Sequence, residues 1–177
     1  MDISLILSRR YKGAQWSLLG DNYSGLTWLS EDIAQPSLAD LEAVWAEVQF
    51  EVAYEAVQKQ RQAKYQAESD PIFFDFQRGE ASEQDWLDAV EAVKVALPYP
   101  ALVFFDGNTG EGSMEPQISA GVTALHTNQF TLEGHTFDGW NTVADGSGTA
   151  YADGAEYDFS ADLTLYAQWV AEPVEEV

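Results

Sequence analysis

Residues 102–169 decide the fold of this chain, and they read LVFFDGNTGEGSMEPQISAGVTALHTNQFTLEGHTFDGWNTVADGSGTAYADGAEYDFSADLTLYAQW. The stretch opens with an apolar run at 102–105. It closes with residues 163–169, where apolar side chains alternate with polar or amphipathic ones. Alternation of this kind, in β-branched and aromatic residues, is typical of a half-buried strand. Nine glycines lie between the two ends. That density favours the tight turns of a small β domain over helices.

Four groups of residues in this stretch match the pattern of a known family. They are Phe105-Asp106-Gly107-Asn108, Gly134-His135-Thr136-Phe137-Asp138-Gly139-Trp140-Asn141, Asp145-Gly146-Ser147-Gly148 followed by Tyr151, and Leu165-Tyr166-Ala167-Gln168-Trp169. In order and without gaps, they resemble the Listeria–Bacteroides repeat, the B repeat of internalin-type surface proteins. The family often has Tyr at the position of His135. The resemblance covers about two fifths of the chain. It implies a compact β-grasp-like fold and an extracellular adhesion or spacer module without catalysis.

Charge divides the chain into two parts near residue 100. All 8 Lys and Arg residues lie at or before Lys94, and the residues after 100 carry 13 of the 30 carboxylates. Pro98-Tyr99-Pro100 stops a helix and makes a stiff junction at the same place. We therefore predict an N-terminal anchoring domain at 1–100, a B-repeat domain at 101–170 and an acidic tail at 171–177.

The composition also excludes several classes of function. The net charge is −22, so the chain has little with which to neutralise phosphates, and we expect no nucleic acid partner. An anionic membrane surface would repel it, and no stretch has the length of a membrane span, so we expect no membrane insertion. Cys is absent, which removes disulfide and thiolate chemistry. The first ten residues lack the pattern of a secretory signal, because their basic residues follow the apolar run.

The N-terminal part reads as helices with one hairpin, so the predicted fold class is α+β. A short helix is expected at 2–11, and a hairpin joins 14–19 to 26–29 through Gly20-Asp21-Asn22. A long helix begins after Pro36-Ser37 and is expected to continue to about Gln66. Asp70-Pro71 is expected to end it, because the residue before proline avoids the helical region. A further helix begins at the Ser82 cap, with its buried face at Trp86, Val90, Val93 and Leu97.

Five apolar residues of this N-terminal part are the candidate partner-binding residues. The long helix carries an apolar stripe at three- and four-residue steps, and its polar end at 58–64 would be marginal alone. A connector at 72–76 follows, with three Phe in five residues. The connector is either a plug over the helices or a docking patch. The residues predicted to bind a partner are Trp45, Val52, Phe73, Phe74 and Phe76.

Nothing in the sequence forms a catalytic pattern, and we predict no enzyme, no cofactor and no metal. His126 and His135 are the only histidines and do not form a metal-spaced pair. Ser147 is not in a G-x-S-x-G elbow, and the glycine-rich stretch 107–113 lacks the Lys of a phosphate loop. A weak calcium site at Asp145, Asp153, Glu156 and Asp158 is an alternative, although these residues do not match a calcium-loop pattern.

The tryptophans of the repeat are expected in its core, and recognition is expected in its loops. Trp140 and Trp169 lie in predicted strands, where large aromatic side chains are normally buried. The loops 107–116 and 144–156 are the better candidates for adhesion, since loops carry recognition on a rigid scaffold.

Several segments of the N-terminal part match a second pattern, and they include Gly13-Ala14-Gln15-Trp16-Ser17-Leu18, Gly20-Asp21-Asn22, Gln66-Ala67-Glu68-Ser69-Asp70-Pro71-Ile72-Phe73-Phe74 and Gln77-Arg78-Gly79-Glu80. In these segments residues 1–100 resemble small proteins encoded beside tail-fibre genes in tailed phages. Together with the repeat, the resemblance implies a non-enzymatic bacteriophage virion protein of the tail or its fibres, assembled in the host cytoplasm. Its partners would be other virion proteins of the fibre, tail or capsid, in a multi-subunit assembly, with a host surface as a further partner. The alternatives are a tail-fibre assembly chaperone, a capsid decoration protein and a bacterial surface adhesin.

Overall fold

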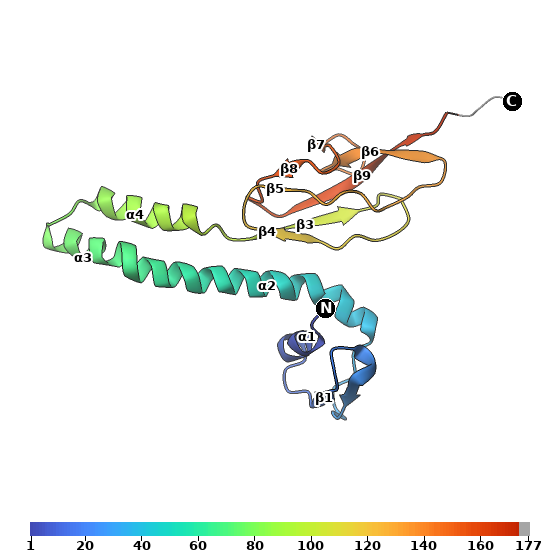
Figure 1. Cartoon of the computed structure of the whole chain (residues 1–177), viewed down its shortest axis with the longest axis horizontal. Helices are drawn as coiled ribbons and strands as arrows, with labels where there is room; N and C mark the ends of the chain where they lie inside the picture. Colours follow the sequence, from blue (N-terminus) through green and yellow to red (C-terminus); the bar gives the residue numbers. More distant parts are fainter. Residues whose placement is uncertain (174–177) are drawn as a thin grey trace. The chain divides into compact units, whose positions relative to one another are not determined.

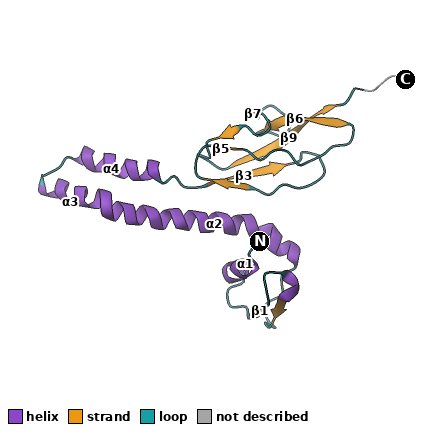
Figure 2. Ribbon diagram, in the orientation of Figure 1, coloured by secondary structure: helices purple, strands orange, loops and turns teal. Residues whose placement is uncertain are grey.

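The computed structural model describes residues 1–173, and the chain forms two compact units, Met1–Ala53 and Tyr54–Val177. The first unit holds α1 (Ile3–Arg10), β1 (Trp16–Leu18), a short 3-10 turn (Tyr23–Gly25), β2 (Leu26–Trp28) and the first half of α2 (Leu38–Lys64). The second holds the rest of α2, α3 (Asp70–Arg78), α4 (Glu83–Ala96) and strands β3 to β9 (Figure 1). Helices precede a β domain, so the α+β class is confirmed (Figure 2).

The first unit has a small hydrophobic core, which the predicted helix and hairpin cover together with α2. Asp2 caps α1 by accepting a hydrogen bond from the Leu5 backbone N–H at 2.9 Å. β1 and β2 are antiparallel, which confirms the predicted hairpin, and Trp16 lies opposite Trp28. The buried core consists of Ile3, Ile6, Leu7, Leu41 and Val48, with the aromatic residues of the hairpin packed around it. One face of α1 and one face of α2 therefore meet, which is what their apolar spacing predicts.

α2 ends at Lys64, close to the end expected near Gln66, but the helical backbone does not stop at Asp70-Pro71, which corrects the expectation from the sequence. A π-helical turn at Tyr65–Ser69 follows α2 and leads directly into α3. Pro71 lies in the first turn of α3, where a missing N–H is tolerated. The connector expected at 72–76 is therefore helical. α3 ends at Gly79, whose φ of 74° is the left-handed conformation that glycine adopts at such ends.

α4 begins and ends as predicted and is joined to α2 at its end. Ser82 and Asp85 form a reciprocal capping box at its start. Arg61 donates a hydrogen bond from Nε to the Leu97 carbonyl at 2.7 Å, and its guanidinium lies 3.9 Å from the centre of the Tyr99 ring. Tyr99 also stacks on Tyr54, with ring centres 4.4 Å apart. These contacts hold the end of α4 and the Pro98-Tyr99-Pro100 junction against α2.

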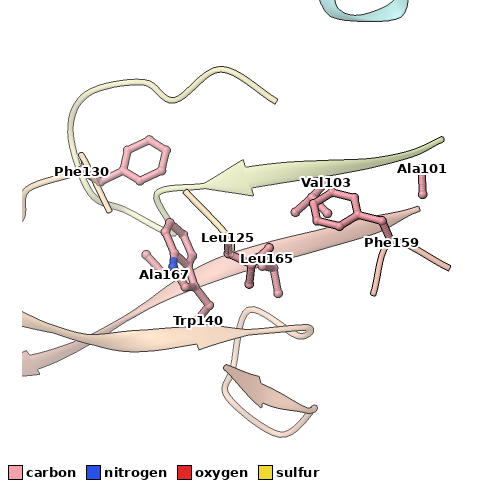
Figure 3. Packing of buried hydrophobic residues seen from close by; sticks show 8 residues of the cluster. All are labelled: Ala101, Val103, Leu125, Phe130, Trp140, Phe159, Leu165 and Ala167. Carbon is pink, nitrogen blue, oxygen red and sulfur yellow. The ribbon is translucent and has the colours of Figure 1, made fainter. Parts of the chain in front are cut away.

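The β domain is a five-stranded mixed sheet with the order β4-β3-β9-β6-β7. Its strands are β3 (Ala101–Asp106), β4 (Gln117–Ser119), β6 (His135–Asn141), β7 (Ala150–Tyr151) and β9 (Leu163–Ala171). β3 and β9, the first and last strands, are parallel neighbours, while β6 is antiparallel to β9. A second ladder pairs β5 (Thr123–Ala124) with β8 (Glu156–Tyr157). The core consists of Ala101, Val103, Leu125, Phe130, Trp140, Phe159, Leu165 and Ala167 (Figure 3).

The two predicted core tryptophans differ in how they are buried. Trp140 is 1% exposed, and its ring lies 5.0–6.2 Å from three phenylalanine rings. Trp169 is half-buried against the same core and donates its indole N–H to the Gly107 carbonyl at 2.9 Å. The indole N–H of Trp140 is buried and has no hydrogen-bond partner among the described residues. Both side chains pack in the core, as predicted.

Hydrogen bonds from and to side-chain amides hold the turns of the β domain in place. Asn108 donates to the carbonyls of Ala144 and Ala167 at 2.7 and 2.9 Å. Asn141 is buried and accepts hydrogen bonds from the backbone N–H groups of Val143 and Gly148, both at 3.0 Å. These bonds satisfy backbone groups that the short strands leave unpaired, so the polar residues of the repeat pattern have structural roles.

Independent folding of the two predicted domains, 1–100 and 101–170, stays a prediction. The β domain has a hydrophobic core of its own, so the fragment 101–177 is expected to fold alone. A dispersed amide NMR spectrum of the fragment would show this, and a collapsed spectrum would contradict the boundary. The predicted tail at 171–177 begins on the last residue of β9, and its residues 174–177 lie outside the described part of the chain.

Candidate partner-binding surface

The five predicted partner-binding residues lie in different units. Trp45 and Val52 belong to the first unit, and Phe73, Phe74 and Phe76 belong to the second. Trp45 is half-buried against the core of its unit, where it lines an open depression of about 530 Å³ with Ile3 and Leu18. Val52 is 37% exposed. Whether any of the five binds a partner stays a prediction.

The three phenylalanines of α3 point in two directions. Phe73 and Phe76 are half-buried, and the Phe73 ring lies 5.2 Å from the Trp86 ring of α4. Phe74 is 57% exposed. The geometry therefore divides the two hypotheses for this segment: Phe73 and Phe76 pack onto the helices, and Phe74 is available for docking.

Phe74 lies in an open depression on the side of α3. The depression has a volume of about 470 Å³ and is lined by Gln66, Asp70, Pro71, Phe74, Asp75 and Arg78. Arg78 is paired with Asp75 and with Glu80 on the surface. The depression therefore combines one exposed aromatic ring with a polar rim, which is the pattern of a protein-binding site.

Residues 54–97, here called the helical arm, form no hydrophobic cluster among the described residues. Both clusters lie elsewhere, one in the first unit and one in the β domain. Among the described residues of the arm, only Ser69 and Val93 are buried. Trp86, Val90 and Leu97 are half-buried on the predicted face of α4. Helices gain most of their stability from tertiary packing, so an arm with so little core is suited to packing against another protein.

Two exposed apolar residues of the arm were not predicted. Leu87 is 43% exposed and Val95 is 72% exposed, both on α4. The sequence assigned the apolar face of this helix to Trp86, Val90, Val93 and Leu97, and these two residues lie outside that face. Their spacing of eight residues, about two helical turns, was the available signal.

The polar residues considered for chemistry have ordinary structural partners. His126 is exposed and stacks on the Phe105 ring with centres 5.8 Å apart. The Nδ1 atom of His135 lies 2.9 Å from the Glu133 carbonyl oxygen. Asp153 accepts a hydrogen bond from the Asn128 backbone N–H at 2.8 Å. Within residues 1–173 the structure shows no group of three or more His, Asp or Glu side chains arranged to hold a metal ion.

Hydrogen bonds lower the pKa of five aspartates. The Leu5 backbone N–H lowers the pKa of Asp2, and serine side chains lower the pKa of the others, which are Asp40, Asp85, Asp145 and Asp158. A folded pKa below the unfolded value means that the stabilisation exists above the unfolded pKa. It is lost as pH falls through the folded value.

Replacing Asp85 by Asn is expected to destabilise the protein at neutral pH but not in acid. Asn keeps the shape of the cap and removes its charge. The difference in melting temperature from the wild type should be largest above pH of about 5 and should shrink as pH falls below about 4. Asp21→Asn is the control, because it removes one surface carboxylate that does not cap a helix. A difference for Asp85→Asn that is independent of pH would contradict the role of the charged cap.

The chain joins a helical N-terminal region to a small β domain. Residues 102–168 match the family model of the Listeria-Bacteroides repeat domain. This confirms the predicted repeat in the C-terminal part of the chain. The resemblance of residues 1–100 to tail-fibre-associated phage proteins stays a prediction.

Two proteins of Evansella cellulosilytica are similar to part of the chain. One, named "Putative membrane protein", is 39% identical over 75 residues, which are 39% of this chain and 11% of that protein. The other, named "Putative Gly-rich membrane protein", is 40% identical over 73 residues, or 38% of this chain and 8% of that protein. The chain therefore spans about a tenth of the length of these relatives. In the described residues of this chain, no helix is both long and apolar enough to cross a membrane.

Proposed function

We propose that the protein is a non-enzymatic structural protein of a bacteriophage particle, belonging to the tail or its fibres. The N-terminal region anchors the chain to other virion proteins, and the repeat is exposed for adhesion or spacing. One observation carries this proposal: Phe74 is 57% exposed on a helical arm that has little buried core. An exposed aromatic ring on such an element is typical of a docking site.

The repeat supports the second half of the proposal. It has a core of its own and needs no partner to bury its tryptophans. Its exposed residues at 143–150 form a loop held by Asn141, so the loop can present side chains from a rigid base. The phage context is supported by the resemblance of the N-terminal sequence, which includes the Gly20-Asp21-Asn22 turn and the segment 66–74.

A bacterial surface protein is the second candidate. It is favoured by the names of the two relatives, both of which contain the words "membrane protein". In that setting the repeat would serve the same purpose of adhesion or spacing on a cell envelope, and the helical arm would bind an envelope protein.

Fractionation of a producing culture separates these functions. Purified phage particles, cell envelope and cytoplasm are each digested, and peptides of this chain are quantified by mass spectrometry against a major capsid protein. The proposal predicts a constant number of chains in each particle. An assembly chaperone would be absent from particles or present in less than one copy each, and a bacterial surface protein would be found in the envelope fraction.

A further inference from the structure

The outward face of α4 carries the two exposed apolar residues of that helix in a regular pattern. At 100° per residue, six side chains lie within about 60° of the direction of Glu91. The six are exposed in the structure and comprise Gln84, Leu87, Asp88, Glu91, Lys94 and Val95. Val93, which is buried, lies on the opposite side of the helix. Leu87 and Val95 are four residues to either side of Glu91, so the face is symmetric about that residue.

Charge is distributed unevenly along the helical arm. Residues 68–91, at the end that includes α3, hold eight carboxylates and one cation, Arg78. The rest of the arm, residues 54–67 and 92–97, holds four cations and one carboxylate, Glu55. The hydrogen bonds from Arg61 to the Leu97 and Lys94 carbonyls place this cation of α2 beside the end of α4. The arm thus has one acidic end and one basic end.

We propose that the outward face of α4 binds the same face of a second copy of this chain, with the two helices antiparallel. In this arrangement, centred on Glu91, Leu87 of one copy is level with Val95 of the other. The acidic end of each arm lies beside the basic end of the other, which is the self-complementarity that a two-fold interface requires. A parallel arrangement would place like charges together along the whole arm.

This pairing uses a different surface from the anchor of the proposed function. The anchor is assigned to Phe74 and the depression on α3, and the pairing is assigned to α4. A single pair of helices buries less surface than stable interfaces require, so the dimer is expected to be weak and to depend on concentration. Its effect would be to display the repeat in pairs, which increases the avidity of adhesion.

Sedimentation of the full-length protein over a range of concentrations tests the pairing. The wild type should change from the mass of one chain to that of two as concentration rises. Val95→Glu should raise the dissociation constant by about tenfold or more, because it places a third carboxylate on a contact that excludes water. Glu91→Gln should lower it by roughly threefold, since it removes a like-charge pair at the two-fold axis.

A charge swap tests the antiparallel direction. Lys59→Glu with Lys64→Glu makes the basic end acidic, and Asp88→Lys with Glu91→Lys replaces two of the eight carboxylates of the acidic end by cations. Each double variant should dimerise more weakly alone, and an equal mixture of the two should restore dimers, because the carboxylates introduced at 59 and 64 of one copy then lie beside the cations introduced at 88 and 91 of the other. Glu115→Lys with Glu133→Lys, in the β domain, is the control for net charge. Circular dichroism confirms that each variant keeps its helices.

Three outcomes would overturn the pairing. They are a wild type that stays monomeric at every soluble concentration, a dimer unaffected by Val95→Glu, and a mixture of swapped variants that dimerises no better than its components. Phe74→Ser should leave the dimer unchanged. A dimeric protein that is absent from particles would contradict the proposed function alone, and a monomeric protein present in particles would contradict the pairing alone.

Discussion

Trp140→Ala is expected to lower the unfolding free energy of the β domain by about 3–5 kcal/mol, the range typical of large aromatic residues removed from a core. Trp140 is 1% exposed and packs against Phe105, Phe130 and Phe137. Its removal leaves a cavity beside these rings, and such a cavity adds to the cost of the lost apolar contacts. Urea unfolding followed by far-ultraviolet circular dichroism measures the loss.

Trp140→Phe is the matched control. It keeps an aromatic ring and removes the indole N–H, which has no hydrogen-bond partner among the described residues. Leaving such a group buried is unfavourable, so the Phe variant should lose much less stability than the Ala variant. Trp169→Ala should fall between them, because Trp169 is half-buried and its N–H is bonded to Gly107. An unfolding midpoint unchanged by Trp140→Ala would contradict this core.

Local rules predicted the elements of the chain better than its long-range arrangement. The Gly20-Asp21-Asn22 turn is a local signal, and it correctly predicted the hairpin in which β1 pairs with β2. The apolar run at 102–105 and the alternation at 163–169 also predicted the opening and closing strands. Their parallel pairing in the centre of one sheet was not, because it joins residues about sixty positions apart and no local pattern encodes it.

The helix through Pro71 shows where a local rule is overridden. The residue before a proline usually avoids the helical region. Here Asp70 is helical with φ −62° and ψ −38°, since the π turn at Tyr65–Ser69 changes the hydrogen-bond spacing before the proline. Buried Ser69 donates to the Tyr65 carbonyl at 3.3 Å within that turn. Such an irregular turn has no sequence pattern as clear as the proline rule that it overrides.

The candidate site was predictable in composition but not in geometry. The sequence shows three Phe in five residues, yet it cannot tell which of them faces outward once the segment is helical. The structure distinguishes Phe74 from its neighbours because α3 packs on Trp86 through Phe73. Leu87 and Val95 were missed, since a helix with one complete apolar stripe gives no reason to look for a second.

Replacing Phe73 and Phe74 together by Ser is expected to release the protein from particles. The anchor is assigned to Phe74 and the depression on α3, and apolar burial contributes about 25 cal/mol per Å² before the costs of association. Removing two phenylalanines should therefore weaken the contact by several kcal/mol, enough to remove most chains from the particle. Quantitative mass spectrometry of purified particles measures the remaining copies.

Single variants separate binding from folding in this experiment. Phe74→Ser removes the exposed ring, while Phe73→Ser also disturbs packing against Trp86. Release by Phe74→Ser, with the helical content and the melting of the β domain unchanged, would assign the effect to the contact. Incorporation of the double variant at the wild-type copy number would place the anchor elsewhere, with the hairpin at 14–29 as the next candidate.

The central claim is that the helical arm is covered in the assembled particle while the repeat is exposed, and cysteine labelling tests it most directly. The chain has no Cys, so single variants Gln77→Cys on α3 and Ser113→Cys in the β domain each supply one reactive thiol at an exposed position. The rate of reaction with a maleimide is compared between the free protein and intact particles. The account predicts that residue 113 reacts at the same rate in both and that residue 77 is protected in particles. Equal rates for residue 77 in the two states, or protection of residue 113, would contradict it.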